Sequence, residues 1–280
     1  MSAVPTQARL APEEQAELAE ELTKYYTSQY RDDVCLPNWK DHLAKRRDED
    51  ANFRAILERT EKWVLGRRVG ANERVLVVGG GTGADFMAFA RRGCETHAVE
   101  PSTKAVRIAH LKAKQEGLDS SRFIEGVAEK LPYVSNMFDF VWSWTVIEHV
   151  QNVERSLREM VRVLKPGGTM FIGTVDYRGC YEPHYKMYLP CFLPAPVVKL
   201  VLRLRGRDPA FYSTLALTNA REIARVFKSL DVVAQRVVYP WNAELREPKT
   251  MGQRTARWIS ERLDIDTNLH WVVRKRGEGG

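Results

Sequence analysis

Residues 74–83 read RVLVVGGGTG, and this stretch decides how the chain folds. RVLVV is a mostly β-branched run without polar alternation, which is typical of a strand buried on both faces. The glycines that follow allow a tight turn, and residues 84–92 then have the composition of a helix. A strand, a glycine-rich turn and a helix N-terminus together predict a site for a nucleotide or another anionic group.

The chain around this stretch alternates short strands with helices. Further strands are predicted over residues 96–99, 123–125, 138–144, 169–174, 232–238 and 269–274. Helices are predicted over residues 84–92, 104–116, 153–164 and 220–230, the last with Thr218 as its N-cap. The alternation predicts an α/β fold: a Rossmann-like, doubly wound parallel sheet of seven strands with helices on both faces.

Three segments stand outside this alternation. Residues 1–72 contain two helical patterns, over 13–30 and 48–65, and are predicted to form a helical cap before an α/β domain over 73–280. Residues 176–215 are rich in Tyr, Pro and Arg and are predicted to be an insertion. A second insertion is predicted over residues 240–266, with a helix around 254–263.

Composition narrows the class of protein. The 280 residues carry 43 Lys plus Arg against 36 Asp plus Glu, a net charge of +7, but no nucleic-acid-binding motif is present, so no nucleic-acid partner is expected. No apolar run reaches the roughly 18 residues of a membrane span. The acidic N-terminal stretch is unlike a signal peptide, which predicts a cytoplasmic protein. Four widely spaced cysteines are predicted to be free thiols: Cys35, Cys94, Cys180 and Cys191.

The glycine turn leaves the identity of the cofactor open. Gly79, Gly81 and Ala84 fit the pattern G-x-G-x-x-A, which suits NAD as well as other nucleosides. Glu100 follows Gly79 by 100 − 79 = 21 residues, at the end of the next predicted strand. A carboxylate at this position can accept hydrogen bonds from both ribose hydroxyls.

In the order of its motifs the chain resembles the class I S-adenosylmethionine-dependent methyltransferases. The resemblance covers about residues 73–175 and rests on RVLVVGGGTG (74–83), AVEPS (98–102), GVAEKLP (126–132), FDFVWSWTVIEHV (138–150) and LREMVRVLKPGGTMFIGT (157–174). It implies S-adenosylmethionine as the cofactor in place of NAD. The residues implied to bind it are Gly79, Gly80, Gly81, Gly83, Asp85, Glu100, Pro101, Ser102, Ala128, Glu129 and Trp144.

Two positions depart from the family pattern. Val77 stands where the family often has an acidic residue that helps to hold the cofactor's amino group, and Asp85 could supply a charge nearby. Val127 stands where the family often has Asp, which leaves the adenine amino group to backbone acceptors or to Glu129.

The acceptor side is predicted from residues after the fourth and fifth strands. The resemblance places His149 beside the donor methyl group as the first candidate base, with His184 in the insertion as the second. Tyr177, Tyr181 and Tyr185 are predicted to bind the acceptor. Asp176, Glu182 and His184 could ligate a divalent metal, but their spacing matches no metal motif, so no metal is predicted.

These features predict an O-methyltransferase that acts on a sugar or glycan hydroxyl. The alternative acceptor is lipophilic, such as a quinone precursor or a lipid-linked intermediate, bound through the apolar residues 189–204. The same stretch could instead form a lid, a homodimer contact or a membrane-surface element. A third possibility is a non-catalytic cofactor-binding protein, which only the missing carboxylates at 77 and 127 support.

Overall fold

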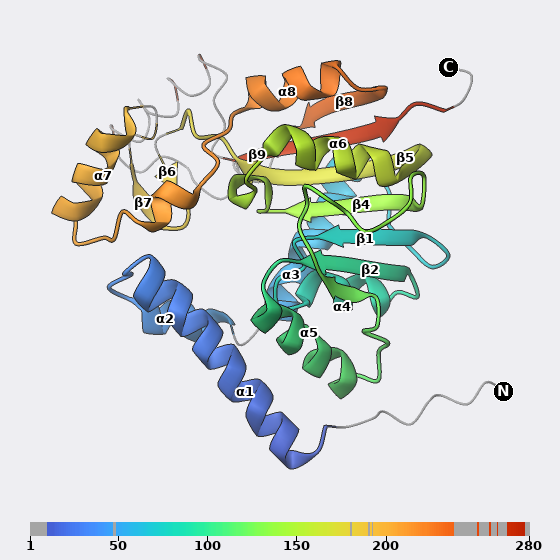
Figure 1. The fold of residues 1–280 in the computed structure, drawn as a ribbon, viewed down its shortest axis with the longest axis horizontal. Coiled ribbons are helices and arrows are strands. Elements are labelled where there is room, and N and C mark those ends of the chain that lie inside the picture. The colour runs from blue at the N-terminus through green and yellow to red at the C-terminus, as the bar shows by residue number, and fades with distance from the viewer. Residues whose placement is uncertain are drawn as a thin grey trace.

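The centre of the molecule is a seven-stranded sheet with the strand order β3-β2-β1-β4-β5-β9-β8 (Figure 1). The structure is a computed structural model that describes residues 10–46, 49–179, 181–189, 191, 193–237, 251, 258, 262 and 268–277. The strands are β1 (Arg74–Val78), β2 (Glu95–Glu100), β3 (Phe123–Glu125), β4 (Phe138–Trp144), β5 (Leu164–Val175), β8 (Val232–Val237) and β9 (Asn268–Lys275). The predicted α/β, Rossmann-like fold is confirmed.

One strand departs from the predicted parallel sheet. Strands β1 to β5 pair in parallel, but β9 runs antiparallel to both of its neighbours, β5 and β8. The prediction of a fully parallel sheet was therefore wrong at β9. An antiparallel strand needs no crossover helix to reach its neighbour, and the helix predicted around residues 254–263 could not tell the two directions apart.

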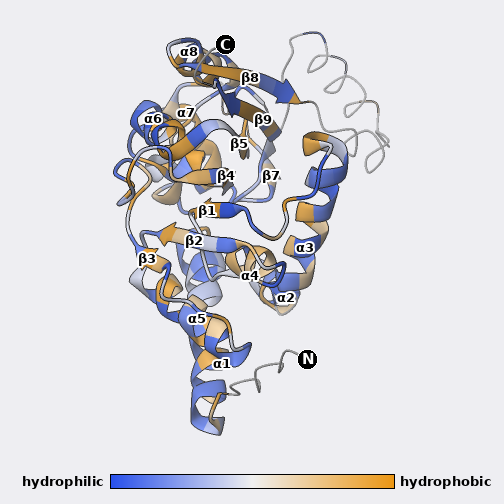
Figure 2. Cartoon of the chain, turned by 90° about the vertical axis from the view of Figure 1, so that its right-hand side faces the viewer, coloured by the Kyte–Doolittle hydropathy of each residue, from blue (hydrophilic) through white to orange (hydrophobic). Residues whose placement is uncertain are grey.

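Helices cover both faces of the sheet, as predicted. On one face lie α3 (Glu49–Thr60), α4 (Ala84–Ala90) and α5 (Thr103–Gln115), and on the other lie α6 (Val153–Val163) and α8 (Ala220–Lys228). Apolar residues gather on the strands and on the helix sides that pack against them (Figure 2). The first core contains Phe53, Phe89 and Trp142, and the second contains Met160 and Ile223.

Helix α8 begins at Ala220 as predicted, but its N-cap is one residue later than predicted. Asn219 is the N-cap, because its side-chain oxygen accepts hydrogen bonds from the backbone N–H groups of Arg221 and Glu222. The Thr218 hydroxyl instead donates to the Glu222 carboxylate at 3.0 Å. Asparagine and threonine are both good N-caps, so the sequence alone did not separate them.

The N-terminal segment contains more helix than expected. Helix α1 (Pro12–Thr27) continues into a π-helical turn (Ser28–Asp33), and a short α2 (Trp39–Lys45) follows it. Helix α3 continues into a second π-helical turn (Glu61–Leu65). Leu18 of α1 packs against Ile108 of α5, whereas α3 contributes directly to the sheet core. None of the described helices is long and apolar enough to cross a membrane.

The first insertion builds a small core of its own. It contains the two-stranded β6 (Tyr181–Glu182) and β7 (Met187–Tyr188), then α7 (Ala195–Leu204) and a 3₁₀ turn (Phe211–Thr214). Val34 and Leu36, which follow α1, belong to the same apolar cluster, and Arg207 donates a hydrogen bond to the Cys35 carbonyl at 2.6 Å. Segments distant in sequence therefore pack together beside α2 (Figure 1).

Two predictions fall largely outside the described residues. The second insertion, 240–266, and its helix around 254–263 lie there except at three isolated positions, and so does Cys180. Cys35, Cys94 and Cys191 form no disulfide within the described part of the chain.

Candidate active site

The predicted site residues lie along one edge of the sheet. The glycine loop follows β1, Glu100 ends β2, residues 144–149 follow or end β4, and the insertion follows β5. Because these four strands are parallel, their carboxyl ends meet at the same edge. In open α/β sheets, ligands bind in the crevice outside this edge.

The glycine loop leaves room for a ligand at one position. Gly79, Gly81 and Gly83 have φ of +71°, +51° and +92°, which favour glycine. A Cβ on Gly79 would overlap the Val146 side chain, and one on Gly83 would lie 2.9 Å from the Ala109 Cβ. A Cβ on Gly81 would meet nothing within 4 Å. The loop therefore packs against the protein except at Gly81, where its backbone borders open space.

Glu100 is held against this loop. Its side chain is buried, and its carboxylate accepts hydrogen bonds from the backbone N–H groups of Gly81 and Ser102, each at 3.0 Å. Burial raises the pKa of Glu100, and the two N–H groups oppose that rise. Ser102 also caps α5 by accepting from the Ala105 N–H, after the exposed Pro101. The carboxylate thus has the position that ribose recognition requires.

A buried polar network, which the sequence did not predict, fixes the loop from the N-terminal side. Thr82 donates to the Glu49 carboxylate at 2.8 Å, Tyr26 hydrogen-bonds to both residues, and Lys112 donates to Glu49 at 2.7 Å. The neighbouring Tyr25 has its pKa raised to about 12 by burial and by the nearby negative charge of Glu100. Helix α1 therefore contributes to the cofactor side. The adjacent tyrosines in α1 were the only sequence signal.

Asp85 and the tryptophans of β4 lie at the other end of the loop. The Trp142 indole N–H donates to the Asp85 carboxylate at 2.9 Å, and burial raises the pKa of Asp85 to about 7. Trp144 is half-buried and stacks on Trp142, and its ring lies over Gly173, where a Cβ would overlap it. The Asp85 charge is therefore placed at the start of α4, near the end of β4.

The residues predicted to flank adenine have structural contacts of their own. Ala128 is buried in the core, and Val127 is 46% exposed. The Glu129 carboxylate accepts hydrogen bonds from the backbone N–H groups of Gln151 and Asn152, at 2.7 and 3.2 Å. Glu129 therefore anchors the turn before α6, and its contact with adenine stays a prediction.

The two candidate bases come together although they are distant in sequence. The Nε2 atoms of His149 and His184 lie 3.1 Å apart, and His184 Nδ1 lies 2.6 Å from the Glu182 carboxylate. Glu182 is fully buried and also accepts a hydrogen bond from the Tyr185 N–H at 2.7 Å. The pKa of His149 is lowered, first because surrounding groups displace water from its ring and second because His184 lies beside it. One edge of His149 remains open to solvent.

The metal ligands considered from sequence do not form one group. Asp176 is paired with the Arg178 guanidinium at 2.5 Å, and Glu182 contacts His184 from the side opposite to His149. A different set, Glu148, His149 and His184, has ligand atoms within 4.8 Å of one another. Glu148 Oε2 accepts from the Thr174 hydroxyl at 2.7 Å, whereas the buried Glu148 Oε1 has no hydrogen-bond partner among the described residues. The two histidines would have to give up their mutual contact to bind a cation together through Nε2.

The three tyrosines predicted to bind the acceptor are mostly internal. Tyr177 and Tyr185 are buried in the insertion's apolar cluster, and the Tyr185 hydroxyl donates to the Asp208 carbonyl at 2.5 Å. Tyr181 is half-buried, and its ring meets that of Tyr188 edge-on. Acceptor binding by these residues stays a prediction, which Tyr181 fits better than the two buried tyrosines do.

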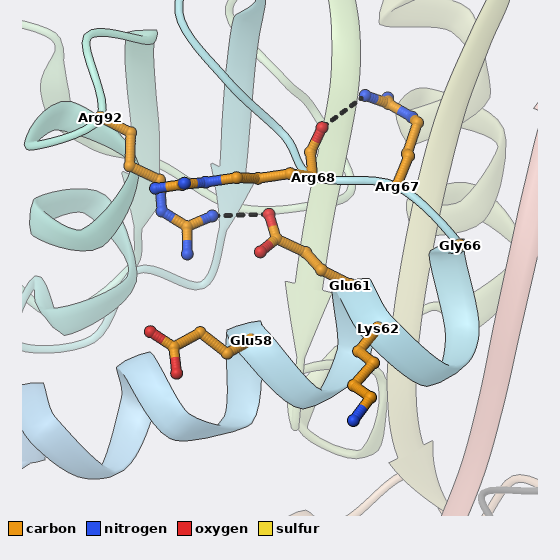
Figure 3. A pocket seen from close by; sticks show the side chains of 7 residues that line it. All are labelled: Glu58, Glu61, Lys62, Gly66, Arg67, Arg68 and Arg92. Atoms are coloured by element: carbon orange, nitrogen blue, oxygen red, sulfur yellow. Dashed lines mark hydrogen bonds and ion pairs between the residues drawn. The ribbon is translucent and has the colours of Figure 1, made fainter.

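A hollow of about 480 Å³ lies elsewhere, at the amino ends of β1 and β2 (Figure 3). It is lined by Glu58, Glu61, Lys62, Gly66, Arg67, Arg68 and Arg92. Its charged groups are partly satisfied, because Arg92 pairs with Glu61 and Arg67 pairs with Glu73. It lies at the edge of the sheet opposite to the glycine loop, so it is separate from the candidate active site.

Known proteins are similar to this chain in sequence and in fold. A family profile described as a methyltransferase domain matches residues 76–172. The demethylmenaquinone methyltransferase of Renibacterium salmoninarum is 30% identical over 182 residues, which cover 63% of this chain and 70% of that protein. The chain belongs to the class I S-adenosylmethionine-dependent methyltransferases. S-adenosylmethionine, not NAD, is the cofactor.

Two further relatives and one solved structure are also similar to this methyltransferase. The ubiquinone biosynthesis O-methyltransferase of Agrobacterium fabrum is 33% identical over 51% of this chain and 64% of its own length. The demethylmenaquinone methyltransferase of Tropheryma whipplei is 32% identical over 52% of this chain. This match spans 59% of that protein's length. A solved geranyl diphosphate methyltransferase in complex with S-adenosylmethionine shares the fold, with a TM-score of 0.51, 20% identity and coverage of 82% and 86%.

The residues of the methyltransferase fit this cofactor. The open side of Gly81 gives its backbone access to a ligand, and Glu100 lies beside it with acceptor oxygens for a ribose diol. Asp85 places a carboxyl group at the start of α4, and its contact with the cofactor's amino group stays a prediction. Thr145, directly after β4, has φ of +55° and an exposed side chain. Such backbone strain in a residue other than glycine is frequent at functional sites.

Proposed function

We propose that this methyltransferase transfers a methyl group to a hydroxyl oxygen of a small molecule, with His149 as the proton acceptor. The observation that carries the proposal is the array of Glu182, His184 and His149 beyond the carboxyl end of β4. When bound, the cofactor supplies an electrophilic methyl group on a sulfonium. An alcohol or phenol must lose its proton during the transfer, so it needs a base in this position.

The hydrogen bonds of the array define which nitrogen accepts that proton. The Glu182 carboxylate accepts from His184 Nδ1–H, so the Nε2 of a neutral His184 carries a lone pair. His149 then donates its Nε2–H to this lone pair at 3.1 Å, which leaves His149 Nδ1 as the acceptor. A proton gained at Nδ1 creates a positive charge on His149. The charge is stabilised through His184 by the buried Glu182 carboxylate.

The electrostatics favour a neutral His149 before the reaction. Its lowered pKa means that the imidazole stays unprotonated at neutral pH and is ready to accept a proton. If His149 is the base, the rate should fall only as the pH approaches the lowered pKa of His149, about 4. A wild-type rate that is already halved at pH 7 would contradict this assignment.

For the acceptor we propose a lipophilic hydroxyl compound, such as a quinone precursor. By name, one relative is a ubiquinone biosynthesis O-methyltransferase and another is a demethylmenaquinone methyltransferase. The apolar α7 belongs to the same cluster as Tyr185, which is next to His184 in sequence. The sugar acceptor expected from the sequence rested on three tyrosines. Two of them are buried, with the Tyr185 hydroxyl already engaged in the fold, which removes the reason to rank a sugar first.

The test is turnover of methyl-labelled S-adenosylmethionine against dihydroxy-aromatic quinone precursors, simple phenols, sugars and glycosides. We expect label in the O-methyl ethers of the lipophilic phenols and weaker or no transfer to sugars. Preferential labelling of a sugar would restore the acceptor predicted from the sequence. Calorimetric titration with the cofactor is the control for folding. Cofactor binding without transfer to any member of the panel would favour a non-catalytic cofactor-binding protein.

A further inference from the structure

The insertion after β5 carries an unusual charge pattern. Residues 183–207 contain no acidic residue and five basic ones, which are Lys186, Lys199, Arg203, Arg205 and Arg207. The chain as a whole has nearly balanced charges, with 43 basic and 36 acidic residues. The positive charge of this segment is therefore concentrated on one part of the molecule, around α7.

Helix α7 has two apolar sides, of which only one is used inside the fold. Val198 and Leu202 are fully buried against the insertion's cluster. On the other side Val197, Leu200 and Leu204 are 43%, 53% and 77% exposed. Their spacing of three and four residues places them in one stripe along the helix, and the exposed Leu193 extends it. Large exposed apolar residues in a continuous stripe mark an interaction surface.

Cationic side chains border this stripe. Arg203 and Arg205 are exposed, and Lys199 is half-buried. No acidic side chain in the described part of the chain pairs with any of these three. Helix α7 lies at the left-hand margin of the molecule in Figure 1, so a flat surface can reach it.

We propose that α7 attaches this protein to the surface of a bilayer that contains anionic phospholipids. Val197, Leu200 and Leu204 would enter the boundary between headgroups and acyl chains, while Lys199, Arg203 and Arg205 contact lipid phosphates. A second copy of the chain fits this surface poorly, because pairing the two stripes would bring together two sets of unpaired positive charges. The helix has ten residues, so it lies on a bilayer and does not span it.

The attachment has a consequence for the site. Tyr185 packs in the same apolar cluster as Val198 and Leu202, and His184 is its neighbour in sequence. Docking of α7 would therefore bring the histidine pair close to the lipid surface. The proposal rests on the exposed face of α7 and stands whether or not the lipophilic acceptor is correct.

Vesicle co-sedimentation of the full chain tests this proposal. The vesicles are phosphatidylcholine alone, or phosphatidylcholine with about one part in four of phosphatidylglycerol. We expect binding to the anionic vesicles and at least tenfold weaker binding to the neutral ones. We also expect salt to weaken it, because exposed charges are screened. The absence of binding to anionic vesicles at low salt would overturn the proposal.

Two pairs of substitutions separate the apolar and the electrostatic contributions. Leu200→Ser with Leu204→Ser should lower binding to anionic vesicles at least tenfold. Lys199→Gln with Arg203→Gln should lower it about fivefold per charge and abolish the preference for anionic lipid. The matched control is Val134→Ser with Val233→Ser, two exposed apolar residues elsewhere, which should change nothing. Thermal melting should stay unchanged in all three variants.

Two outcomes would overturn the assignment of α7. The first is a serine variant of Leu200 and Leu204 that binds anionic vesicles as tightly as the wild type. The second is a wild-type dimer in analytical ultracentrifugation that the same serine pair converts into a monomer without a change in vesicle binding. That result would make a second copy of the chain the occupant of the stripe.

Discussion

The cofactor side and the acceptor side of this methyltransferase are built in different ways. The cofactor side uses short continuous stretches, the glycine loop and Glu100, whose contacts run through backbone N–H groups of nearby residues. The acceptor side uses side chains from separate segments. His149 follows β4, His184 lies in the insertion 35 positions later, and Val34 comes from the N-terminal segment. A local motif therefore shapes the first, which the Glu49 network then fixes in place, whereas tertiary packing alone brings the second together.

This difference affects how each side tolerates substitution. A site made of backbone groups at a sheet edge depends on few side chains, because the fold itself positions the donors. A site assembled from an insertion depends on the small apolar core that holds the insertion in place. The predictions below test this contrast, beginning with the largest effect.

The largest loss of turnover is expected when the proposed base, His149, is removed. His149→Ala should lower turnover by roughly 10²–10⁴, the range for loss of a general base, with cofactor affinity retained. His110→Ala is the matched control, because its ring contacts only the Phe123 carbonyl among the described hydrogen bonds, and it should keep the full rate. Turnover in His149→Ala equal to wild type would move the base to His184.

The insertion's core should be sensitive to Tyr185, although this residue was expected to bind the acceptor. Tyr185→Ala removes a fully buried ring and should lower the free energy of unfolding by roughly 3–5 kcal/mol. Tyr185→Phe removes only the hydroxyl that accepts from the Tyr212 N–H and should cost about 1–3 kcal/mol. Denaturant titration measures both. Unchanged stability with a raised acceptor KM in Tyr185→Ala would favour direct substrate contact.

The cofactor side should depend on the Glu100 carboxylate. Glu100→Ala removes two charge-assisted hydrogen bonds to a ribose, each worth roughly 1.5–3 kcal/mol, so cofactor affinity should fall at least tenfold in calorimetric titration. Glu125→Ala is the control, since that carboxylate also ends a strand but contacts only Thr103. Affinity of Glu100→Ala within twofold of wild type would show that Glu100 does not hold the ribose.

A smaller effect is expected at the half-buried Tyr181. Tyr181→Ala should raise the acceptor KM several-fold and leave the cofactor affinity unchanged, because the two sites are built from different segments. Steady-state kinetics with each substrate varied in turn measure this split. Equal losses for both substrates would assign the insertion a supporting role for the whole site.

The smallest effect concerns stability at Asp85. Its folded pKa is raised to about 7, so the folded state holds a proton that the unfolded state releases near pH 4. Asp85 therefore lowers the free energy of unfolding progressively as the pH rises from about 4 to about 7, and by the full amount above pH 7. Asp85→Asn should raise the free energy of unfolding at pH 8 by about 1 kcal/mol, with no gain below pH 4. A loss of stability at pH 8 would contradict the assignment.

Chelation also bears on the acceptor side. We expect a chelator to leave wild-type turnover intact, because among Glu148, His149 and His184 the two histidines already hydrogen-bond to each other, and only Glu148 Oε1 lacks a hydrogen-bond partner among the described residues. Loss of turnover that a divalent cation restores would place a metal on these three residues. The histidine array would then serve as a ligand set in place of a proton relay.

The sequence predicted the strands and the glycine turn of the cofactor side well, because their signals are local. Strands β1, β3 and β4 have the predicted boundaries. The conformation of the glycine turn and the N-cap of α5 each depend on residues that are close together in the sequence. The direction of β9 was predicted wrongly, because a buried apolar strand has the same sequence pattern whether it pairs in parallel or antiparallel. The Glu49 network escaped prediction because its partners on α1, α5 and the glycine loop are distant along the chain.

The sequence by itself determined the α/β fold, the glycine loop with Glu100, and the membership of a methyltransferase family, because each depends on the order and spacing of neighbouring residues. Only the tertiary structure decided that His149 meets His184 with Glu182 behind it, and that Tyr177 and Tyr185 are core residues. It also decided that one side of α7 remains exposed. The physical reason is that burial and side-chain contact depend on which distant segments pack together. A pattern along the chain gives the composition of each segment and leaves that choice open.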